Sequence, residues 1–250
     1  YNLLFLLLIM SERISSGSFD FNEFLNGGYE KDVITMIAGP PASGKTNLGI
    51  LAGCSCSREG KKVIFIDSEG GFSVERVKQI VGENFEEILE RFFLLEPVNF
   101  KEQAESFKKL LQYLKKEQVG LIVIDGMSML YRIELMDASK SKDIEKVRGV
   151  NGEMAKQMRT LAEIARKQKI PVLITNQVYS SYVEGDAFSE EKKVNIIGGD
   201  LFKYWSKCII QLNKSSSKRK AILLKHRSLP EKEMSFEIRD KGIFKKKGLF

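Results

Sequence analysis

The stretch from Val33 to Ile50 reads Val-Ile-Thr-Met-Ile-Ala-Gly-Pro-Pro-Ala-Ser-Gly-Lys-Thr-Asn-Leu-Gly-Ile. Its first six residues, 33–38, form an apolar run that is long enough for one buried strand. Residues 39–46 follow as G-x-x-x-x-G-K-T, and residues 47–52 can continue as a helix. This motif between a strand and a helix is typical of a phosphate-binding loop. The alternative is a surface loop rich in glycine and proline.

The residue types of this loop explain how it would hold a triphosphate. Gly39 and Gly44 permit backbone angles that other residues avoid, so successive N–H groups can turn inward around an anion. The helix that follows points its positive end at the same anion. Lys45 is placed to reach the β- and γ-phosphates, and Thr46 to bind Mg²⁺ through its hydroxyl. The predicted binding residues are Gly39, Pro40, Pro41, Ala42, Ser43, Gly44, Lys45, Thr46 and Asn47.

Further apolar runs alternate with helical patterns along the chain. We expect strands, with amphipathic helices between them, at residues 33–38, 61–67, 92–95, 121–125 and 172–175. Such alternation predicts an α/β fold with a mostly parallel sheet and helices on both faces. In sheets of this kind, ligands bind at the carboxyl ends of the strands.

The chain after Trp205 has a different pattern. Three apolar runs follow one another without helices, at residues 208–212, 221–224 and 234–238. This predicts an antiparallel C-terminal extension of the sheet. Two spans, 127–152 and 178–200, have no assigned element. Each is a long connection after a strand that bears a polar motif, which favours a functional role.

Length and composition favour a single soluble domain. The chain has 250 residues, of which 43% are hydrophobic and 29% charged, as is usual for globular proteins. We expect one domain over residues 11–250, preceded by an apolar appendage at 1–10 that is too short to span a membrane. The three cysteines are too few for a disulfide framework, which favours a reducing, cytoplasmic location.

The net charge of +7 is unevenly distributed. Residues 1–125 carry 18 acidic and 14 basic side chains, whereas residues 126–250 carry 15 acidic and 26 basic ones. A basic C-terminal half predicts a polyanionic partner. The alternative is that these basic side chains are solvated and only confer solubility.

Polar residues stand at or just after the ends of three predicted strands. Asp125 ends an apolar run, which is the pattern of the acid that holds Mg²⁺ through water beside a phosphate-binding loop. Glu69 follows a second run, where a carboxylate could accept a proton from the water that attacks a γ-phosphate. A solvated loop acid is the alternative. The pair Asn176-Gln177 follows a third run, and an amide there can hydrogen-bond a γ-phosphate and signal its loss to the next loop.

Lys225 and Arg227 end a predicted strand in the basic half of the chain. Alternation places both side chains on one face, where they could reach a phosphate, including one on a neighbouring subunit. They could equally face solvent. His226 would point to the other face and have a structural role.

In this order, the motifs resemble those of the RecA-like recombinases. The resemblance covers nearly all of Ile14 to Ile243 and rests on the phosphate-binding loop and four further motifs: Ile66-Asp67-Ser68-Glu69-Gly70, Leu121-Ile122-Val123-Ile124-Asp125, Met129-Leu130-Tyr131-Arg132 and Ile174-Thr175-Asn176-Gln177-Val178. Lys203-Tyr204-Trp205-Ser206-Lys207 and Lys225-His226-Arg227-Ser228 look most like short archaeal members of this family that are implicated in DNA repair.

The resemblance implies a RecA-like P-loop NTPase core that binds ATP with Mg²⁺. It implies three catalytic residues, namely Lys45, the carboxylate Glu69 and the γ-phosphate sensor Gln177. Thr46 and Asp125 would hold the metal, and Lys225 and Arg227 would form a finger that acts on a neighbouring subunit. The spans 127–152 and 178–199 would contain two DNA-facing loops.

Two departures from the family pattern shape the expected function. Gly126 stands where these recombinases usually have serine, which removes a hydroxyl beside the metal. We find neither an N-terminal DNA-binding domain nor an F-x-x-A docking peptide, so an oligomer is compatible with the sequence but a long filament is not expected.

The expected function is an accessory role in DNA repair and homologous recombination. The protein would bind ATP and DNA, hydrolyse ATP weakly with Mg²⁺, and work with a recombinase or another repair protein. One alternative is a KaiC-like signalling ATPase that forms rings. Another is an interaction module in which ATP is structural.

Candidates for DNA contact are basic and aromatic residues of the two long connections: Arg132, Lys140, Lys142, Tyr179, Tyr182, Lys192 and Lys193. Exposed rings beside cations suit single-stranded DNA, because bases stack on them without sequence preference. The alternative keeps the rings in the core and the charges in water.

Overall fold

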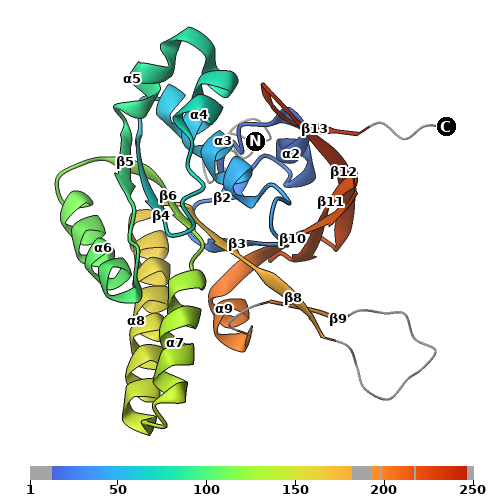
Figure 1. Cartoon of the computed structure of the whole chain (residues 1–250). Helices are drawn as coiled ribbons and strands as arrows, with labels where there is room; N and C mark the ends of the chain where they lie inside the picture. The colour runs from blue at the N-terminus through green and yellow to red at the C-terminus, as the bar shows by residue number, and fades with distance from the viewer. Residues whose placement is uncertain (1–12, 182–192, 197–198, 217, 247–250) are drawn as a thin grey trace, which may run out of the picture.

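The computed structural model describes residues 13–181, 193–196, 199–216 and 218–246. They form one large sheet with helices packed on it (Figure 1). The helices of this part of the chain are α2 (Phe19–Phe24), α3 (Lys45–Arg58), α4 (Val74–Val81), α5 (Phe85–Leu89), α6 (Phe100–Tyr113), α7 (Met129–Lys140), α8 (Ile144–Gln168) and α9 (Gly199–Trp205), with a 3₁₀ helix, η1 (Gly82–Asn84).

Within the described residues the large sheet has nine strands, in the order β13-β12-β11-β10-β3-β7-β6-β4-β5. The parallel strands are β10 (Ser206–Ser215), β3 (Ile34–Ala38), β7 (Val172–Asn176), β6 (Val119–Asp125), β4 (Lys62–Asp67) and β5 (Phe92–Leu95). The antiparallel strands that continue from β10 are β11 (Lys218–Lys225), β12 (Lys232–Arg239) and β13 (Gly242–Lys245).

The predicted α/β fold and its antiparallel C-terminal extension are therefore confirmed. β13 has no counterpart among the predicted strands, because its four residues are too few to show a periodic pattern.

Both faces of the parallel sheet are covered by helices, as predicted. Along β3, Met36 packs in a core with side chains of α6, α7, α8 and α9, whereas Ile37 packs in a second core with α2, α3, α4 and α5. Both side chains are fully buried. This explains why the strand reads as a continuous apolar run instead of an alternating one.

The span 127–152 was expected to be a long connection, and this prediction is wrong. It contains α7 and the first turns of α8, joined by a tight turn. Asp143 caps α8, because its carboxylate accepts the N–H groups of Glu145 (3.0 Å) and Lys146 (3.1 Å).

The apolar pattern gave no sign of these helical turns for two reasons. Met129, Ile133 and Met136 of α7 are exposed, so the apolar residues do not mark a buried face. Gly149 and Gly152 lie inside α8, where glycine lowers helix propensity.

The second unassigned span begins with a two-stranded antiparallel ribbon. β8 (Val178–Ser181) pairs with β9 (Lys193–Ile196), from Val178 opposite Ile196 to Ser181 opposite Lys193. The ribbon extends away from the large sheet (Figure 1). Residues 182–192 lie outside the described part of the chain.

At the N-terminal side, β1 (Arg13–Ile14) pairs with β2 (Tyr29–Glu30). The predicted appendage at 1–10 lies outside the described residues. Among the helices that the structure describes, none has both the length and the apolar character needed to cross a bilayer.

Candidate nucleotide-binding site

The phosphate-binding loop, residues 39–46, connects the end of β3 to the start of α3, as predicted. Gly44 has φ +111°, in the region that favours glycine, and a Cβ there would lie 2.9 Å from Ile238 Cδ1. Gly39 is not at positive φ, contrary to expectation. It is needed for space, because a Cβ would lie 2.8 Å from the Leu212 carbonyl oxygen of β10.

Lys45 lies folded against its own loop. Its Nζ donates hydrogen bonds to the carbonyl oxygens of Gly39 (3.1 Å) and Pro40 (3.3 Å). Burial lowers the pKa of Lys45, while the nearby carboxylates of Glu69 and Asp125 oppose this shift. A phosphate oxygen would give this buried ammonium an anionic partner in place of carbonyl dipoles.

Thr46 and Asp125 meet where the metal site was predicted. The Thr46 hydroxyl donates to Asp125 Oδ2 at 2.6 Å, and the Thr175 hydroxyl donates to Asp125 Oδ1 at 2.5 Å. Burial raises the pKa of Asp125 to about 6, although both hydrogen bonds oppose the shift. A cation at this position would favour the charged carboxylate.

This pair of oxygens fits Mg²⁺. Mg²⁺ is usually bound by one or two protein oxygens, with phosphate and water completing the octahedron. Within the described residues no group of three or more histidine, cysteine, aspartate or glutamate side chains could hold a metal alone. Thr46 and Asp125 would therefore hold the ion together with the nucleotide.

Glu69 and Gln177 are in direct contact beside the phosphate-binding loop. Gln177 Nε2 donates to Glu69 Oε1 at 3.2 Å. Asp67 fixes the Glu69 backbone, because its carboxylate accepts the N–H groups of Glu69 (3.1 Å) and Phe72 (2.7 Å). The two residues that the sequence proposed as base and sensor are thus brought together.

Gly126 occupies the position where the family pattern has serine. Its φ is +83°, and a Cβ would lie 2.5 Å from Glu69 Cγ. The Glu69 side chain therefore fills the space that a side chain at position 126 would need. Gly126 N–H donates to the Thr175 hydroxyl at 2.8 Å. The turn at Gly126 is therefore linked to the Asp125 carboxylate through Thr175.

A cavity of about 480 Å³ opens over the loop. It is lined by Pro41, Ala42, Gly44, Lys45, Thr46, Asn47, Glu69, Arg219 and Ile238. Six of these were predicted nucleotide-binding residues. The Asn47 side chain is already engaged, because its Oδ1 accepts a hydrogen bond from Arg76 Nε at 2.6 Å. The same Arg76 donates to the carbonyl oxygens of Arg239 (2.9 Å) and Asp240 (2.8 Å).

Sequence reasoning missed Asp67, Thr175 and Arg219 as members of this site. Asp67 ends a strand and Thr175 lies within one, and in each case the polar residue two positions later, Glu69 or Gln177, was chosen instead. A polar residue in an apolar strand beside a known site residue was the available signal for both. No sequence signal identified Arg219, because it reaches the site through the pairing of β10, β11 and β12.

Lys225 and Arg227 lie at the end of the strands opposite to the phosphate-binding loop. β11 runs antiparallel to β10, which is parallel to β3, so its end lies at the amino side of β3. Arg227 donates to both carboxylate oxygens of Asp32 (3.0 and 2.8 Å), and Lys225 Nζ donates to the Lys203 carbonyl oxygen (2.9 Å). The pair therefore cannot reach the phosphate-binding loop of its own chain.

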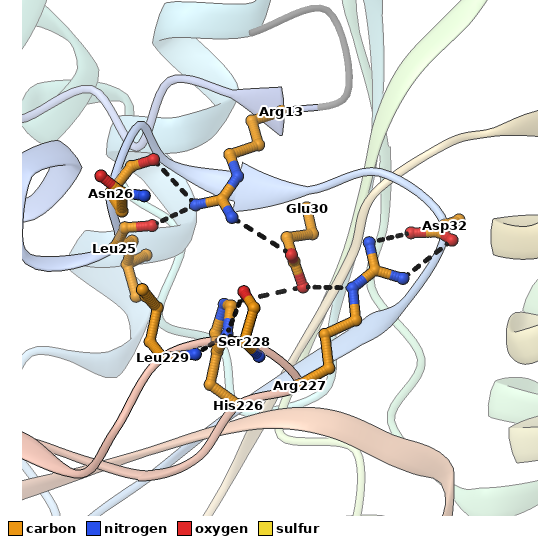
Figure 2. A network of polar contacts seen from close by, with 9 residues as sticks. All are labelled: Arg13, Leu25, Asn26, Glu30, Asp32, His226, Arg227, Ser228 and Leu229. Carbon is orange, nitrogen blue, oxygen red and sulfur yellow. Dashed lines mark hydrogen bonds and ion pairs between the residues drawn. The ribbon is translucent and has the colours of Figure 1, made fainter. Parts of the chain in front are cut away.

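Figure 2 shows how Arg227 and His226 converge on the buried Glu30. The Glu30 carboxylate lies 3.1 Å from Arg227 Nε, 3.2 Å from Arg13 Nη2 and 3.6 Å from His226 Nε2. The prediction that His226 points away from Arg227 is wrong, because β11 ends at Lys225 and alternation stops there. His226 has a structural environment, as expected, since its Nδ1 accepts the N–H groups of Ser228 and Leu229.

The candidate DNA contacts lie on two separate elements. Arg132 and Lys140 are exposed on α7, Lys142 is exposed in the turn after it, and Lys140 forms an ion pair with Asp137 (3.3 Å). Tyr179 on β8 is half exposed, and Lys193 begins β9. Two further candidates, Tyr182 and Lys192, lie outside the described residues.

Comparison with known proteins agrees with this site and fold. A family model described as Rad51 matches residues 9–246. The DNA repair and recombination protein RadB of Methanobrevibacter smithii is 40% identical over 229 residues, which cover 89% of this chain and 92% of that protein. The protein of the same name from Methanocaldococcus jannaschii is 40% identical over 221 residues, 88% and 97% of the two chains.

A solved structure shows the same similarity to RadB proteins. The crystal structure of the RadB recombinase superposes with a TM-score of 0.73 and 35% identity, and covers 92% of this chain and 98% of that one. Since family model, relatives and structure all span most of the sequence, this chain belongs to the Rad51 family of RecA-like recombinases and is similar to its archaeal RadB members.

Proposed function

We propose that this protein is an accessory factor of DNA repair and homologous recombination that binds ATP and DNA and hydrolyses ATP slowly with Mg²⁺. The observation that carries the nucleotide part is the contact between Gln177 and Glu69 beside the phosphate-binding loop. The repair role comes from the relatives, which are named DNA repair and recombination protein RadB.

We assign each residue of the site one task in ATP binding or hydrolysis. Lys45 turns from its own loop carbonyls to the β- and γ-phosphates of ATP. Thr46 and Asp125 would hold Mg²⁺, and the bound ion would supply positive charge that neutralises phosphate charge. Glu69 accepts the proton of the attacking water, and Gln177 binds the γ-phosphate in place of Glu69.

Gln177 also provides a route from the nucleotide to the DNA candidates. It lies between the end of β7 and the start of β8 at Val178. A change in the hydrogen bond of its side chain is therefore passed to the first residue of the ribbon that carries Tyr179. Phosphate loss would alter the ribbon in this way.

DNA binding with and without ATP, measured over a salt series, tests the proposal. Binding to single-stranded DNA should weaken with salt, with a slope of log affinity against log salt near −0.7 per phosphate contact. Replacing Lys192 and Lys193 together by glutamine should make this slope shallower by roughly 1.4, with ATP affinity unchanged. DNA binding that does not depend on salt, or no binding at all, would contradict the repair role and favour a ring-forming signalling ATPase.

The test also covers partners and assembly. We propose a soluble protein of the cytoplasm that acts with a recombinase or another repair protein, as a monomer or a short oligomer rather than as a long filament. Sedimentation with ATP and DNA present would detect long filaments and contradict this part of the proposal.

A further inference from the structure

Arg219 reaches the nucleotide cavity from the C-terminal antiparallel strands. It lies near the start of β11, opposite Phe236 of β12. Alternate residues of β11, Ala221 and Leu223, are buried in the core that packs on α3. Alternation therefore places Arg219 on the same inner face, which is the face of the phosphate-binding loop.

The immediate surroundings of Arg219 belong to that loop. Arg219 lines the 480 Å³ cavity together with Lys45 and Thr46. Its strand partner Phe236 and the neighbouring Ile238 lie against Gly44, since a Cβ on Gly44 would be 3.8 Å and 2.9 Å from their side chains. The arginine is thus part of the wall over the loop, contributed by a segment far away in the sequence.

The guanidinium of Arg219 has an unmet hydrogen-bond donor. Its Nε is buried and has no hydrogen-bond partner within the described structure. The next residue, Lys220, points to the other face of β11, where its Nζ contacts both carboxylate oxygens of Glu233 at 2.9 Å. Of these two adjacent cations, Lys220 is paired on the surface, whereas Arg219 lines the nucleotide cavity and has a buried Nε without a partner.

A buried donor without a partner is unfavourable, and an anion in the cavity would satisfy it. ATP carries more negative charge than Lys45 alone can balance. The planar fork of a guanidinium matches the spacing of phosphate oxygens and binds them with two parallel hydrogen bonds.

We propose that Arg219 is a nucleotide-binding residue that donates hydrogen bonds to the phosphate chain of ATP within the same subunit. The inference rests on the proposed ATP site and adds a second protein cation to it. It differs from the predicted finger of Lys225 and Arg227, which lies at the other end of β11 and would act between subunits.

The test compares Arg219→Gln with the matched control Lys220→Gln. Affinities for ATP and for inorganic tripolyphosphate are measured by calorimetry with Mg²⁺ at fixed salt, and thermal unfolding is followed with and without ATP. Arg219→Gln should weaken both ligands about tenfold or more, the effect of losing charge-assisted hydrogen bonds. Lys220→Gln should leave both affinities unchanged within about twofold.

Thermal unfolding separates a binding role from a structural one. Without nucleotide, Arg219→Gln should unfold close to the temperature of the parent protein, because Arg219 Nε has no hydrogen-bond partner to lose. The shift in unfolding temperature that ATP produces should shrink. Arg219→Lys should recover only part of the affinity, since it keeps the charge but not the fork.

The outcomes distinguish this inference from the proposed function. If the parent and Arg219→Gln bind ATP equally while Lys45→Ala does not bind, the loop assignment stands and the role of Arg219 is refuted. If ATP affinity falls but tripolyphosphate affinity does not, the contact is not to phosphate and the inference is also refuted. If the parent protein does not bind ATP, both proposals fail together.

Discussion

The amide of Gln177 donates a hydrogen bond to the carboxylate of Glu69, 108 residues earlier in the sequence, with an Nε2–Oε1 distance of 3.2 Å. The two side chains come from the carboxyl ends of β7 and β4, which are separated by β6 in the sheet. A γ-phosphate at this position would compete with Glu69 for the Gln177 amide. The contact therefore joins the proposed base to the proposed sensor.

Glu69→Gln tests the base. The substitution keeps the size and the hydrogen bonding of the side chain but cannot accept a proton from water. ATP binding should remain close to that of the parent, while phosphate release should fall by about 10²–10⁴-fold. Nucleotide titration and single-turnover phosphate release are the two measurements. Hydrolysis at the parental rate would assign the base to another residue.

Lys45→Ala tests the phosphate-binding loop. Loss of the ammonium removes a charge-assisted contact to the β- and γ-phosphates, so ATP affinity should fall on the order of tenfold to a hundredfold. The measurement is calorimetric titration with ATP and Mg²⁺. Lys207→Ala is a suitable control, because Lys207 is exposed and is the second residue of β10, at the end of that strand away from the loop. Equal ATP affinity for both variants would refute the loop assignment.

Gly126→Ser tests why this chain departs from the family pattern. Serine would have to adopt φ +83° and would place its Cβ 2.5 Å from Glu69 Cγ. Left-handed backbone and overpacking together should lower the free energy of unfolding by about 2 kcal/mol or more, and the displaced Glu69 should slow hydrolysis. Chemical denaturation gives the stability change.

The matched control is Gly149→Ala in α8, where a Cβ would meet open space. Alanine in a helix should raise the free energy of unfolding by about 0.5–1 kcal/mol relative to glycine. If Gly126→Ser is as stable as the parent, Glu69 does not occupy the space beside position 126 in solution.

His226 gives a prediction for the pH dependence of stability. Burial lowers its pKa, and Glu30 opposes this shift, while Arg13, Arg227 and Lys232 reinforce it. The folded pKa thus lies below the unfolded value of about 6.5. The unfolded chain takes up the proton more readily, so the stabilisation is complete above about pH 6.5 and is lost as the pH falls.

His226→Asn should flatten this dependence. The Asn oxygen can accept the N–H groups of Ser228 and Leu229, as Nδ1 does now, but it does not titrate. The free energy of unfolding should therefore fall less between about pH 7.5 and 5.5 than in the parent. If the free energy of unfolding falls equally with pH in the two proteins, His226 does not contribute to the pH dependence of stability.

A mixing experiment tests the finger between subunits. Lys45→Ala has a defective loop and an intact Lys225, whereas Lys225→Ala has the reverse. If Lys225 acts on the neighbouring subunit, mixing the two should give more phosphate release than the sum of the separate proteins. The Lys225 side chain is exposed and donates a hydrogen bond to the Lys203 carbonyl oxygen, so its removal should leave the fold intact. A mixture that equals the sum would rule out action between subunits.

Much of the fold could be predicted because its central strands are short apolar runs, such as 121–125, each closed by a polar residue. Strands buried on both faces must be apolar throughout, and this makes them visible in the sequence. Among the helices that join them, α4, α6 and α8 show ordinary amphipathic patterns. α7 escaped detection because apolar residues stand at its exposed positions, such as Ile133 and Met136, as well as at its buried ones, so the sequence shows no single apolar stripe.

The site residues that the sequence predicted were those that stand in a recognisable local motif. Lys45, Thr46 and Asp125 follow or end strands in recognisable motifs, and the structure brings them together. Arg219 and Glu30 have no such context. Their roles depend on which strand pairs with which, and in what register, and a local pattern does not contain that information.

The nucleotide cavity is enclosed by two segments that lie far apart in the sequence. This affects the order in which its parts are made during synthesis. Gly39 packs against Leu212, Gly44 against Ile238, and Arg76 holds the carbonyl groups of Arg239 and Asp240. A ribosome that has released only the first two hundred residues has already produced the whole G-x-x-x-x-G-K-T motif, but not the strands that enclose it. Nucleotide can therefore protect only a polypeptide in which β10, β11 and β12 have already been made, and ATP would act as a check that comes after their synthesis.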